Sequence, residues 1–147
     1  MRLALGACIL AFGLAIPPLL TAAQSWCVAP RVNEPLLLDV ERLLTSEDPE
    51  WARRREAYKL RRSSPVTMVR DDATCRRASQ AYWDVLRTSV ADRFGTHADT
   101  PVLMVQVGPM YLVDDQRSRE GPDAYWEVMI FDRKWHRVYG YGAGADN

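Results

Sequence analysis

The sequence predicts a small α+β domain in which helices come first and strands dominate the second half. Two helix-start signals stand between residues 33 and 50, each followed by apolar side chains at helical spacing. After Pro101 the chain changes to short β-branched and aromatic runs joined by short connections, which favour antiparallel neighbours. We expect N-terminal helices, then a strand, a helix and a three-stranded antiparallel meander, with one curved sheet packed on a helix.

Residues 1–23 have the order of a secretory signal peptide. Arg2 precedes an apolar run from Leu3 to Ile16, and small side chains up to Ala23 suit cleavage after that residue. An uncleaved membrane anchor is the alternative, but the run is shorter than the roughly 20 residues that cross a bilayer. We therefore expect an exported chain, periplasmic or secreted, whose residues 24–147 form a single α+β domain without a membrane span.

The cysteines predict a disulfide bond. Cys8 belongs to the predicted signal peptide, so the mature chain keeps Cys27 and Cys75. In an oxidising compartment these two thiols most simply pair with each other, and the alternative is two separate buried thiols. A bridge that closes a loop of this length contributes about 4 kcal/mol to stability when its effect is treated as chain entropy.

Two helices are expected before the first strand. The first covers residues 34–45, starts at Asn33 with a proline in its first turn, and places five apolar residues on one face: Leu36, Leu37, Val40, Leu43 and Leu44. Asp48 followed by proline repeats the start signal and predicts a second helix over residues 49–60. That helix carries few apolar residues, so we expect it on the outside of the domain.

A strand and a third helix follow. Residues 65–70 read PVTMVR, which is typical of a short strand. The third helix is expected from Asp71 or Asp72 to about Phe94, where Gly95 supplies the left-handed residue that commonly ends a helix. Its core face is predicted to hold Cys75, Ala78, Tyr82, Val85 and Leu86.

The last part of the chain contains strand-like segments at residues 101–107, 110–114, 124–131 and 135–141. If Phe131 pairs with His136 across the last turn, both faces of that hairpin carry large apolar groups. A sheet with one wet face alternates more cleanly, so the second face should be covered by the N-terminal helices, a partner or a ligand.

The second predicted helix carries the most distinctive local feature, a basic run with aromatic neighbours. Aromatic rings flanked by arginines bind carboxylates, phosphates or anionic lipid head groups. The candidate anion- or partner-binding residues are Arg54, Arg55, Tyr58, Arg61 and Arg62. The alternative is a solvated face on which Glu50 and Glu56 pair with arginines three or four residues away.

No motif predicts a metal, a cofactor or a catalytic residue. His97 and His136 each lack a second ligand at helical spacing, and the acidic residues 114–123 do not follow the order of a calcium loop. The sequence has no G-x-S-x-G nucleophile motif either. Its 19 basic and 19 acidic residues balance, which argues against a general attraction to nucleic acid.

These observations favour an exported, non-enzymatic binding or interaction module of a bacterial-type cell envelope, whose partner is an envelope protein or a small ligand. Two alternatives stay open. One is a small envelope hydrolase with a dispersed site that uses His136, Asp114 and Arg137. The other is a soluble carrier of a small apolar or anionic ligand, held in a cavity between sheet and helix.

Overall fold

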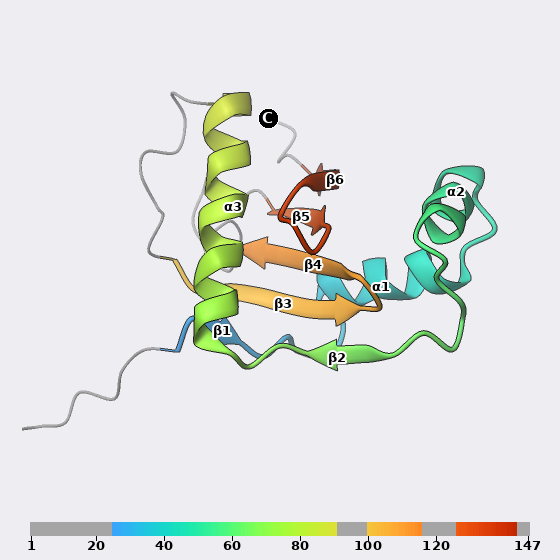
Figure 1. The fold of residues 1–147 in the computed structure, drawn as a ribbon, viewed down its shortest axis with the longest axis horizontal. Coiled ribbons are helices and arrows are strands. Elements are labelled where there is room, and N and C mark those ends of the chain that lie inside the picture. Colours follow the sequence, from blue (N-terminus) through green and yellow to red (C-terminus); the bar gives the residue numbers. More distant parts are fainter. Residues whose placement is uncertain (1–24, 91–99, 116–125, 144–147) are drawn as a thin grey trace, which may run out of the picture.

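A computed structural model describes residues 25–90, 100–115 and 126–143 (Figure 1). Among these residues it shows three helices and a mixed six-stranded sheet, which confirms the predicted α+β class. The helices and strands, in chain order, are β1 (Cys27–Val28), α1 (Pro35–Thr45), α2 (Pro49–Ala57), β2 (Val66–Met68), α3 (Asp72–Val90), β3 (Val102–Val107), β4 (Met110–Asp115), β5 (Trp126–Phe131) and β6 (Arg137–Ala143). The predicted end of α3 near residue 94, with Gly95, lies outside the described residues.

The sheet differs from the expected three-stranded meander. Four strands, β3-β4-β5-β6, form an antiparallel meander, and two more strands lie end to end along the outer edge of β3. β1 pairs parallel with Val102 and Leu103, whereas β2 pairs antiparallel with residues 105–107. The expected strand number is therefore wrong. The two residues of β1 are too few to show an alternating pattern, so only their pairing with β3 reveals the strand.

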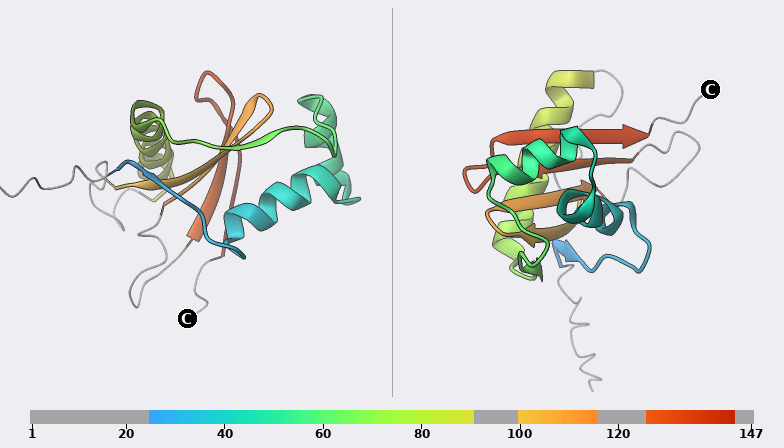
Figure 2. Two further views of the ribbon diagram at one scale, coloured as in Figure 1. Left: turned by 90° about the horizontal axis from the view of Figure 1, so that it is seen from below. Right: turned by 90° about the vertical axis from the view of Figure 1, so that its right-hand side faces the viewer.

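Helices cover both faces of the central strands (Figure 2). α1 packs on one face through buried leucines and Val40, and α3 packs on the other through Cys75, Ala78, Tyr82, Trp83 and Leu86. The face that the sequence assigned to the N-terminal helices, a partner or a ligand is thus covered by α1 of the same chain. A sheet buried on both sides explains why its strands read as nearly continuous apolar runs.

The strand register places side chains of each face in rows across the sheet. One row faces α1 and consists of Val105, Leu112, Ile130 and Tyr139. The neighbouring row faces α3 and includes Met104, Val113 and Met129. Successive side chains of a strand point to opposite faces of the sheet. A slip of one residue would therefore turn the side chains that face α1 toward α3, and those that face α3 toward α1.

α2 ends three residues earlier than the sequence predicts, at Ala57. The N–H of Lys59 donates to the carbonyl of Glu56, and the N–H of Leu60 donates to that of Arg55, which is the Schellman arrangement of a helix end. Lys59 has the left-handed φ of 54° that this arrangement requires. The turn directs Leu60 into the core beneath α1, so the chain leaves the helix in order to bury an apolar side chain.

The last hairpin has a different register from the one expected. Phe131 pairs with Arg137, not His136, and the ladder contains an irregularity between Ile130 and Phe131. Asp132 organises the connection, since its Oδ1 accepts the N–H groups of Lys134 and His136 at 2.8 and 2.9 Å. Trp135 adopts a φ of 64° there and stacks on Tyr111, with ring centroids 5.0 Å apart. A loop shaped by a side chain and a long-range ring contact carries no local sequence signal.

Candidate functional site

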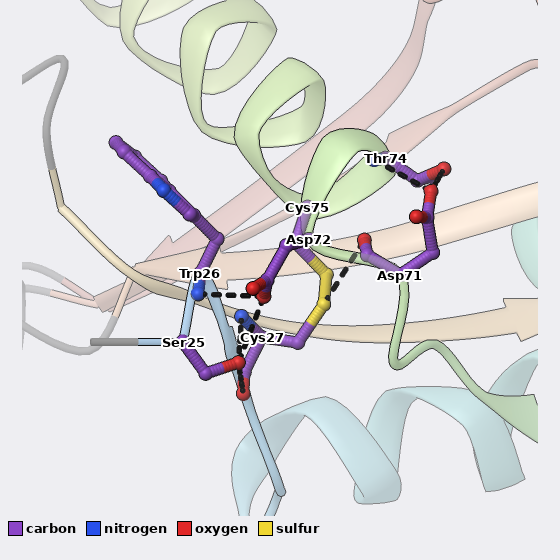
Figure 3. Close-up of a disulfide and its surroundings, with 7 residues drawn as sticks. All are labelled: Ser25, Trp26, Cys27, Asp71, Asp72, Thr74 and Cys75. Atoms are coloured by element: carbon purple, nitrogen blue, oxygen red, sulfur yellow. Dashed lines mark hydrogen bonds between the residues drawn. A yellow bond between two sulfur atoms is a disulfide. The ribbon is translucent and has the colours of Figure 1, made fainter. Parts of the chain in front are cut away.

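The predicted disulfide bond is present and joins β1 to the first turn of α3 (Figure 3). The Cα atoms of Cys27 and Cys75 are 5.4 Å apart, and Cys75 is fully buried against the sheet. Asp72 ties the same two segments together, because its Oδ1 accepts the hydroxyl of Ser25 at 2.8 Å and the N–H of Trp26 at 2.9 Å. The disulfide and the hydrogen bonds of Asp72 hold the β1 segment against the start of α3. Both sulfur atoms are used in this bond, so neither is a free thiol.

Asp71 caps α3 beside the disulfide. Its Oδ2 accepts the hydroxyl and the backbone N–H of Thr74, the latter at 2.9 Å. The side-chain hydrogen bond from Thr74, followed by the backbone one, lowers the pKa of Asp71 from its ordinary value. The carboxylate therefore satisfies one of the backbone donors that a helix start leaves open, and its charge suits the positive end of the helix.

A groove between α2 and β6 is the strongest candidate for a binding site. It has a volume of about 450 Å³ and is lined by Glu50, Arg53, Arg54, Ala57, Tyr58 and Val138. All of these residues belong to α2 and its C-terminal cap except Val138, which comes from β6. We call it the α2 groove. Polar and apolar groups share its wall, which suits a ligand that carries one charged group.

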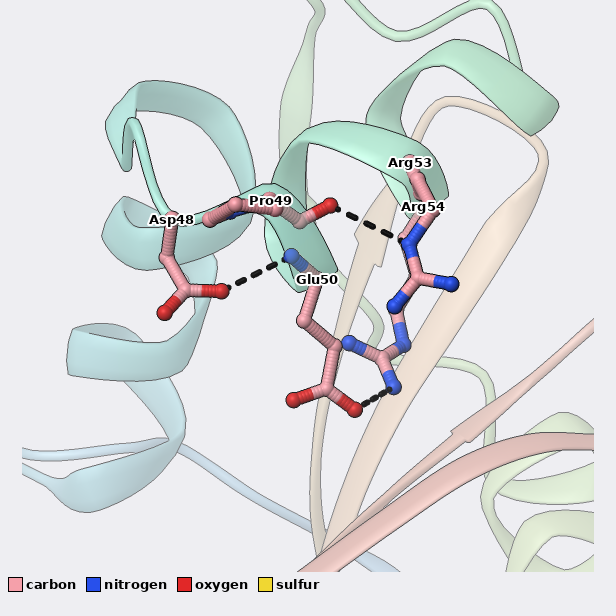
Figure 4. A network of polar contacts seen from close by, with 5 residues as sticks. All are labelled: Asp48, Pro49, Glu50, Arg53 and Arg54. Atoms are coloured by element: carbon pink, nitrogen blue, oxygen red, sulfur yellow. Dashed lines mark hydrogen bonds and ion pairs between the residues drawn. The ribbon is translucent and has the colours of Figure 1, made fainter.

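Arg54 is the most constrained cation of the α2 groove. Its Nη2 pairs with Oε1 of Glu50 at 2.7 Å (Figure 4). Its guanidinium carbon lies 3.6 Å from the ring centroid of Tyr139. The ring of Trp51 is 5.4 Å away and meets Tyr139 edge to face. Its other terminal nitrogen, Nη1, is buried and has no hydrogen-bond partner. The rings hold the guanidinium in place, while only one of its two amino groups has an acceptor.

The other basic residues of this run lie in different places, and Arg53 was not among the candidate site residues. Arg53 lines the α2 groove, is exposed, and donates from Nε to the carbonyl of Pro49 at 3.3 Å. Arg55 instead donates to the carbonyls of Leu43 and Ser46, at 3.1 and 3.0 Å, and so secures the end of α1. Arg61 and Arg62 are exposed beyond the helix and do not line the groove.

The structure therefore brings Arg54 and Tyr58 together and separates them from Arg55, Arg61 and Arg62. Sequence reasoning placed Arg55 on the same stripe as Tyr58, but the stripe faces α1 at Arg55. It missed Val138, because only the tertiary fold brings β6 beside α2. The start of the helix gave one usable signal, since Glu50 lies four residues before Arg54 and was already expected to pair with an arginine.

A second hollow lies at the sheet edge, between the segment around β1 and the end of β2. It has a volume of about 310 Å³ and is lined mainly by apolar residues: Ser25, Cys27, Val28, Ala29, Pro30, Met68, Val69 and Arg70. We call it the edge pocket. It is a surface feature between two strands that share β3, and not the cavity between sheet and helix that a carrier would use.

The structure does not assemble the residues considered for a hydrolase. Asp114 is buried in β4 and pairs with Val128, whereas Arg137 pairs with Phe131 at the other end of the hairpin. His136 lies at that same far end, where its Nδ1 is 3.2 Å from Oδ2 of Asp132. The backbone N–H of His136 is the main cause that lowers the pKa of Asp132. His97 lies outside the described residues.

Within the described ranges, no group of three His, Cys, Asp or Glu side chains is placed to hold a metal ion. No helix in the described part of the chain is both long and apolar enough to cross a membrane. Comparisons of this chain with protein-family models, with curated proteins and with solved structures found no match. The α2 groove and the edge pocket are two hollowed surfaces that the described residues present.

Proposed function

We propose that this chain is an exported, non-enzymatic binding module whose α2 groove takes a carboxylate group of its partner. The observation that carries this proposal is the excess of positive charge in the groove. Two guanidinium groups, those of Arg53 and Arg54, face one carboxylate, that of Glu50, and Nη1 of Arg54 lacks an acceptor. A buried donor without an acceptor destabilises the free protein, and an anion nearby reduces that cost.

The composition of the groove favours a singly charged carboxylate over a phosphate. Glu50 already occupies one amino group of Arg54, and its negative charge repels a doubly charged ligand. Ala57 and Val138 supply apolar wall beside the charged end. An acidic side chain or a chain terminus with a short aliphatic stem combines these two properties. Such a group can belong to an envelope protein or to a small ligand.

Rigid placement of Arg54 supports binding. The Arg54 side chain is only 16% exposed, and its guanidinium is confined by its contact with Tyr139 and its pair with Glu50. A ligand that meets a preorganised cation loses less side-chain entropy than one that must order an exposed arginine. Arg53, which is exposed, would then provide the adjustable second contact.

The export part of the proposal is supported by the Cys27–Cys75 disulfide, because such bonds persist in oxidising compartments and are rare in the reducing cytosol. Residues 1–23 supply the expected signal peptide. Detection of the chain in a periplasmic or culture fraction, with Gln24 as its first residue, would support export and cleavage together.

The groove is tested with acetate as the probe. Its binding is monitored by NMR titration at constant ionic strength, with chloride as the balancing anion. We expect saturable shifts of the backbone amides of Arg53, Tyr58 and Val138. Arg53→Gln should weaken acetate binding about tenfold, since one charge-assisted hydrogen bond is lost.

The matched control is Arg62→Gln, which removes the same charge from an exposed residue that does not line the groove. Equal weakening by both variants would mean that acetate responds to general charge and not to the groove. Shifts that fail to saturate, or that occur elsewhere in the domain, would also contradict the proposal.

A further inference from the structure

We propose that the edge pocket binds a small alkyl carboxylate, whose chain enters the pocket and whose carboxylate contacts Arg70. The pocket has a volume of about 310 Å³ and lies where β1 and β2 meet along the outer edge of β3 (Figure 1). This volume is at the lower end of the range for small-molecule sites, roughly 300–1,000 Å³. The edge pocket shares no residue with the α2 groove.

Apolar groups form most of the wall of the edge pocket. Five side chains from the two neighbouring segments supply them: Val28, Ala29, Pro30, Met68 and Val69. Val28 also packs against the core beneath α1, whereas Val69 packs against the core beneath α3. The wall is therefore supported by both halves of the core, which makes it a preformed apolar surface for an alkyl chain.

The backbone around the pocket leaves no place for a peptide strand on β3. β1 pairs with Val102 and Leu103, and β2 pairs with residues 105–107. The carbonyl of Met104, between these two pairings, accepts the N–H of Val69 at 3.5 Å. Because the outer edge of β3 is already in use over this length, an occupant of the pocket makes side-chain contacts and not a backbone ladder.

Arg70 gives the pocket its positive charge. Among the described residues that line the pocket, it alone is charged, and its side chain is exposed. Within the described part of the chain, no hydrogen bond or ion pair occupies its guanidinium. The two carboxylates that follow it are bound elsewhere, since Asp71 accepts hydrogen bonds from Thr74 and Asp72 accepts them from the β1 segment. The guanidinium is thus free to bind an anion at the mouth of an apolar hollow.

The surroundings of Arg70 favour a head group with a single negative charge. Asp71 and Asp72 follow directly in the sequence, and their charges repel a phosphate more strongly than a carboxylate. Arginine can bind a carboxylate through two parallel N–H groups, which fixes the head while the alkyl chain contacts the apolar wall. An acidic side chain of a second copy carries the same charge, but its stem is too short to fill this volume.

Chain-length dependence tests the alkyl part. Butanoate, hexanoate and octanoate are titrated into the disulfide-bonded protein at constant ionic strength, and the amides of Val28, Met68 and Arg70 are followed by NMR. We expect the affinity to rise by about fourfold for each added methylene. Acetate, the probe for the α2 groove, should leave these three amides unchanged. An affinity that does not depend on chain length, or octanoate shifts confined to the α2 groove, would overturn the proposal.

Arg70→Gln tests the head group. It should weaken octanoate binding about threefold to fivefold, as expected for an exposed ion pair. Binding of 1-octanol, which has the same number of carbon atoms and no charge, should stay the same. Arg77→Gln is the matched control, because Arg77 is an exposed arginine of α3 that does not line the pocket. Equal weakening by both variants, or equal weakening of octanoate and octanol by Arg70→Gln, would contradict the role of Arg70.

Met68→Gln tests the apolar wall in a second way. Met68 is 41% exposed, so a polar replacement leaves the core intact. It should weaken octanoate and 1-octanol alike, by about threefold, because apolar contact with the chain is lost. Leu38→Gln is the control, since Leu38 is 43% exposed on α1 and does not line the pocket. Unchanged binding to Met68→Gln, or the same loss in Leu38→Gln, would refute the assignment of the pocket.

Discussion

Asp39 shows how a single buried charge affects this domain. It lies on α1 among the leucines that face the sheet, is 2% exposed, and pairs with Arg42 at 3.1 Å while its Oδ2 has no hydrogen-bond partner. Burial is the largest effect on this carboxyl and raises its pKa above the ordinary value of 3.8, against the opposing effect of Arg42. Asp71 and Asp132 differ, because the hydrogen bonds that their carboxylates accept lower their pKa values.

The sign of the pH effect follows from linkage. The folded state holds the proton of Asp39 more tightly than the unfolded chain, so stability decreases as pH rises from 3.8 through the raised pKa. We expect Asp39→Asn to increase the free energy of unfolding at neutral pH, and the gain to shrink as acid protonates the native carboxyl. Urea unfolding at neutral pH and near pH 4 checks this. Glu41→Gln, an exposed change on the same helix, should have little effect. A destabilised Asp39→Asn variant would show that the Arg42 pair outweighs burial.

At the scale of secondary structure, the ends of the helices are specified by side chains of different kinds. Pro35 and Pro49 occupy the first turns of α1 and α2, and Asp48 caps α2 by accepting the N–H of Glu50 at 2.8 Å. The end of α2 instead depends on Lys59 in a left-handed conformation, which costs a residue with a Cβ atom about 1–2 kcal/mol. Arg55 then satisfies two carbonyls at the end of α1, which couples the two helices.

This strain at the end of α2 gives a test. Lys59→Gly should raise the free energy of unfolding by about 0.5–1 kcal/mol, because relief of the left-handed conformation exceeds the extra entropy of glycine in the unfolded chain. Lys134→Gly is the control, since Lys134 is exposed and has no positive φ, so there glycine should lower stability slightly. Chemical denaturation of both variants decides between them. Destabilisation by Lys59→Gly would mean that the lysine side chain contributes more than the backbone relief.

At the scale of the whole molecule, helices cover both faces of one sheet. The outer edge of β3 pairs with both β1 and β2. β1 and β2 meet this edge from different parts of the chain, and the disulfide anchors β1 to α3 beside it. The groove between α2 and β6 and the outer edge of β2 lie at the margins of this layered arrangement.

Removal of the disulfide tests how far the whole fold depends on it. Replacement of both Cys27 and Cys75 by serine should lower the free energy of unfolding by about 2–5 kcal/mol, since the unfolded chain regains the freedom of a long loop. Urea unfolding of this variant and of the reduced native chain should agree. Asp72 and its hydrogen bonds to Ser25 and Trp26 remain in both, so the β1 segment keeps part of its attachment. An unchanged midpoint would show that these bonds and the packing suffice.

Local sequence patterns were enough to locate the elements that depend on near neighbours. Proline and apolar spacing predicted the helices at nearly their observed positions, and the bond between Cys27 and Cys75 was predicted from the cysteine count. The strand number, the parallel pairing of β1, the register at Phe131 and the division between Arg54 and Arg55 were decided only by the tertiary structure. The reason is physical: spacing along a helix is a local property, whereas a pairing partner or the direction of a long side chain depends on residues far away in the sequence.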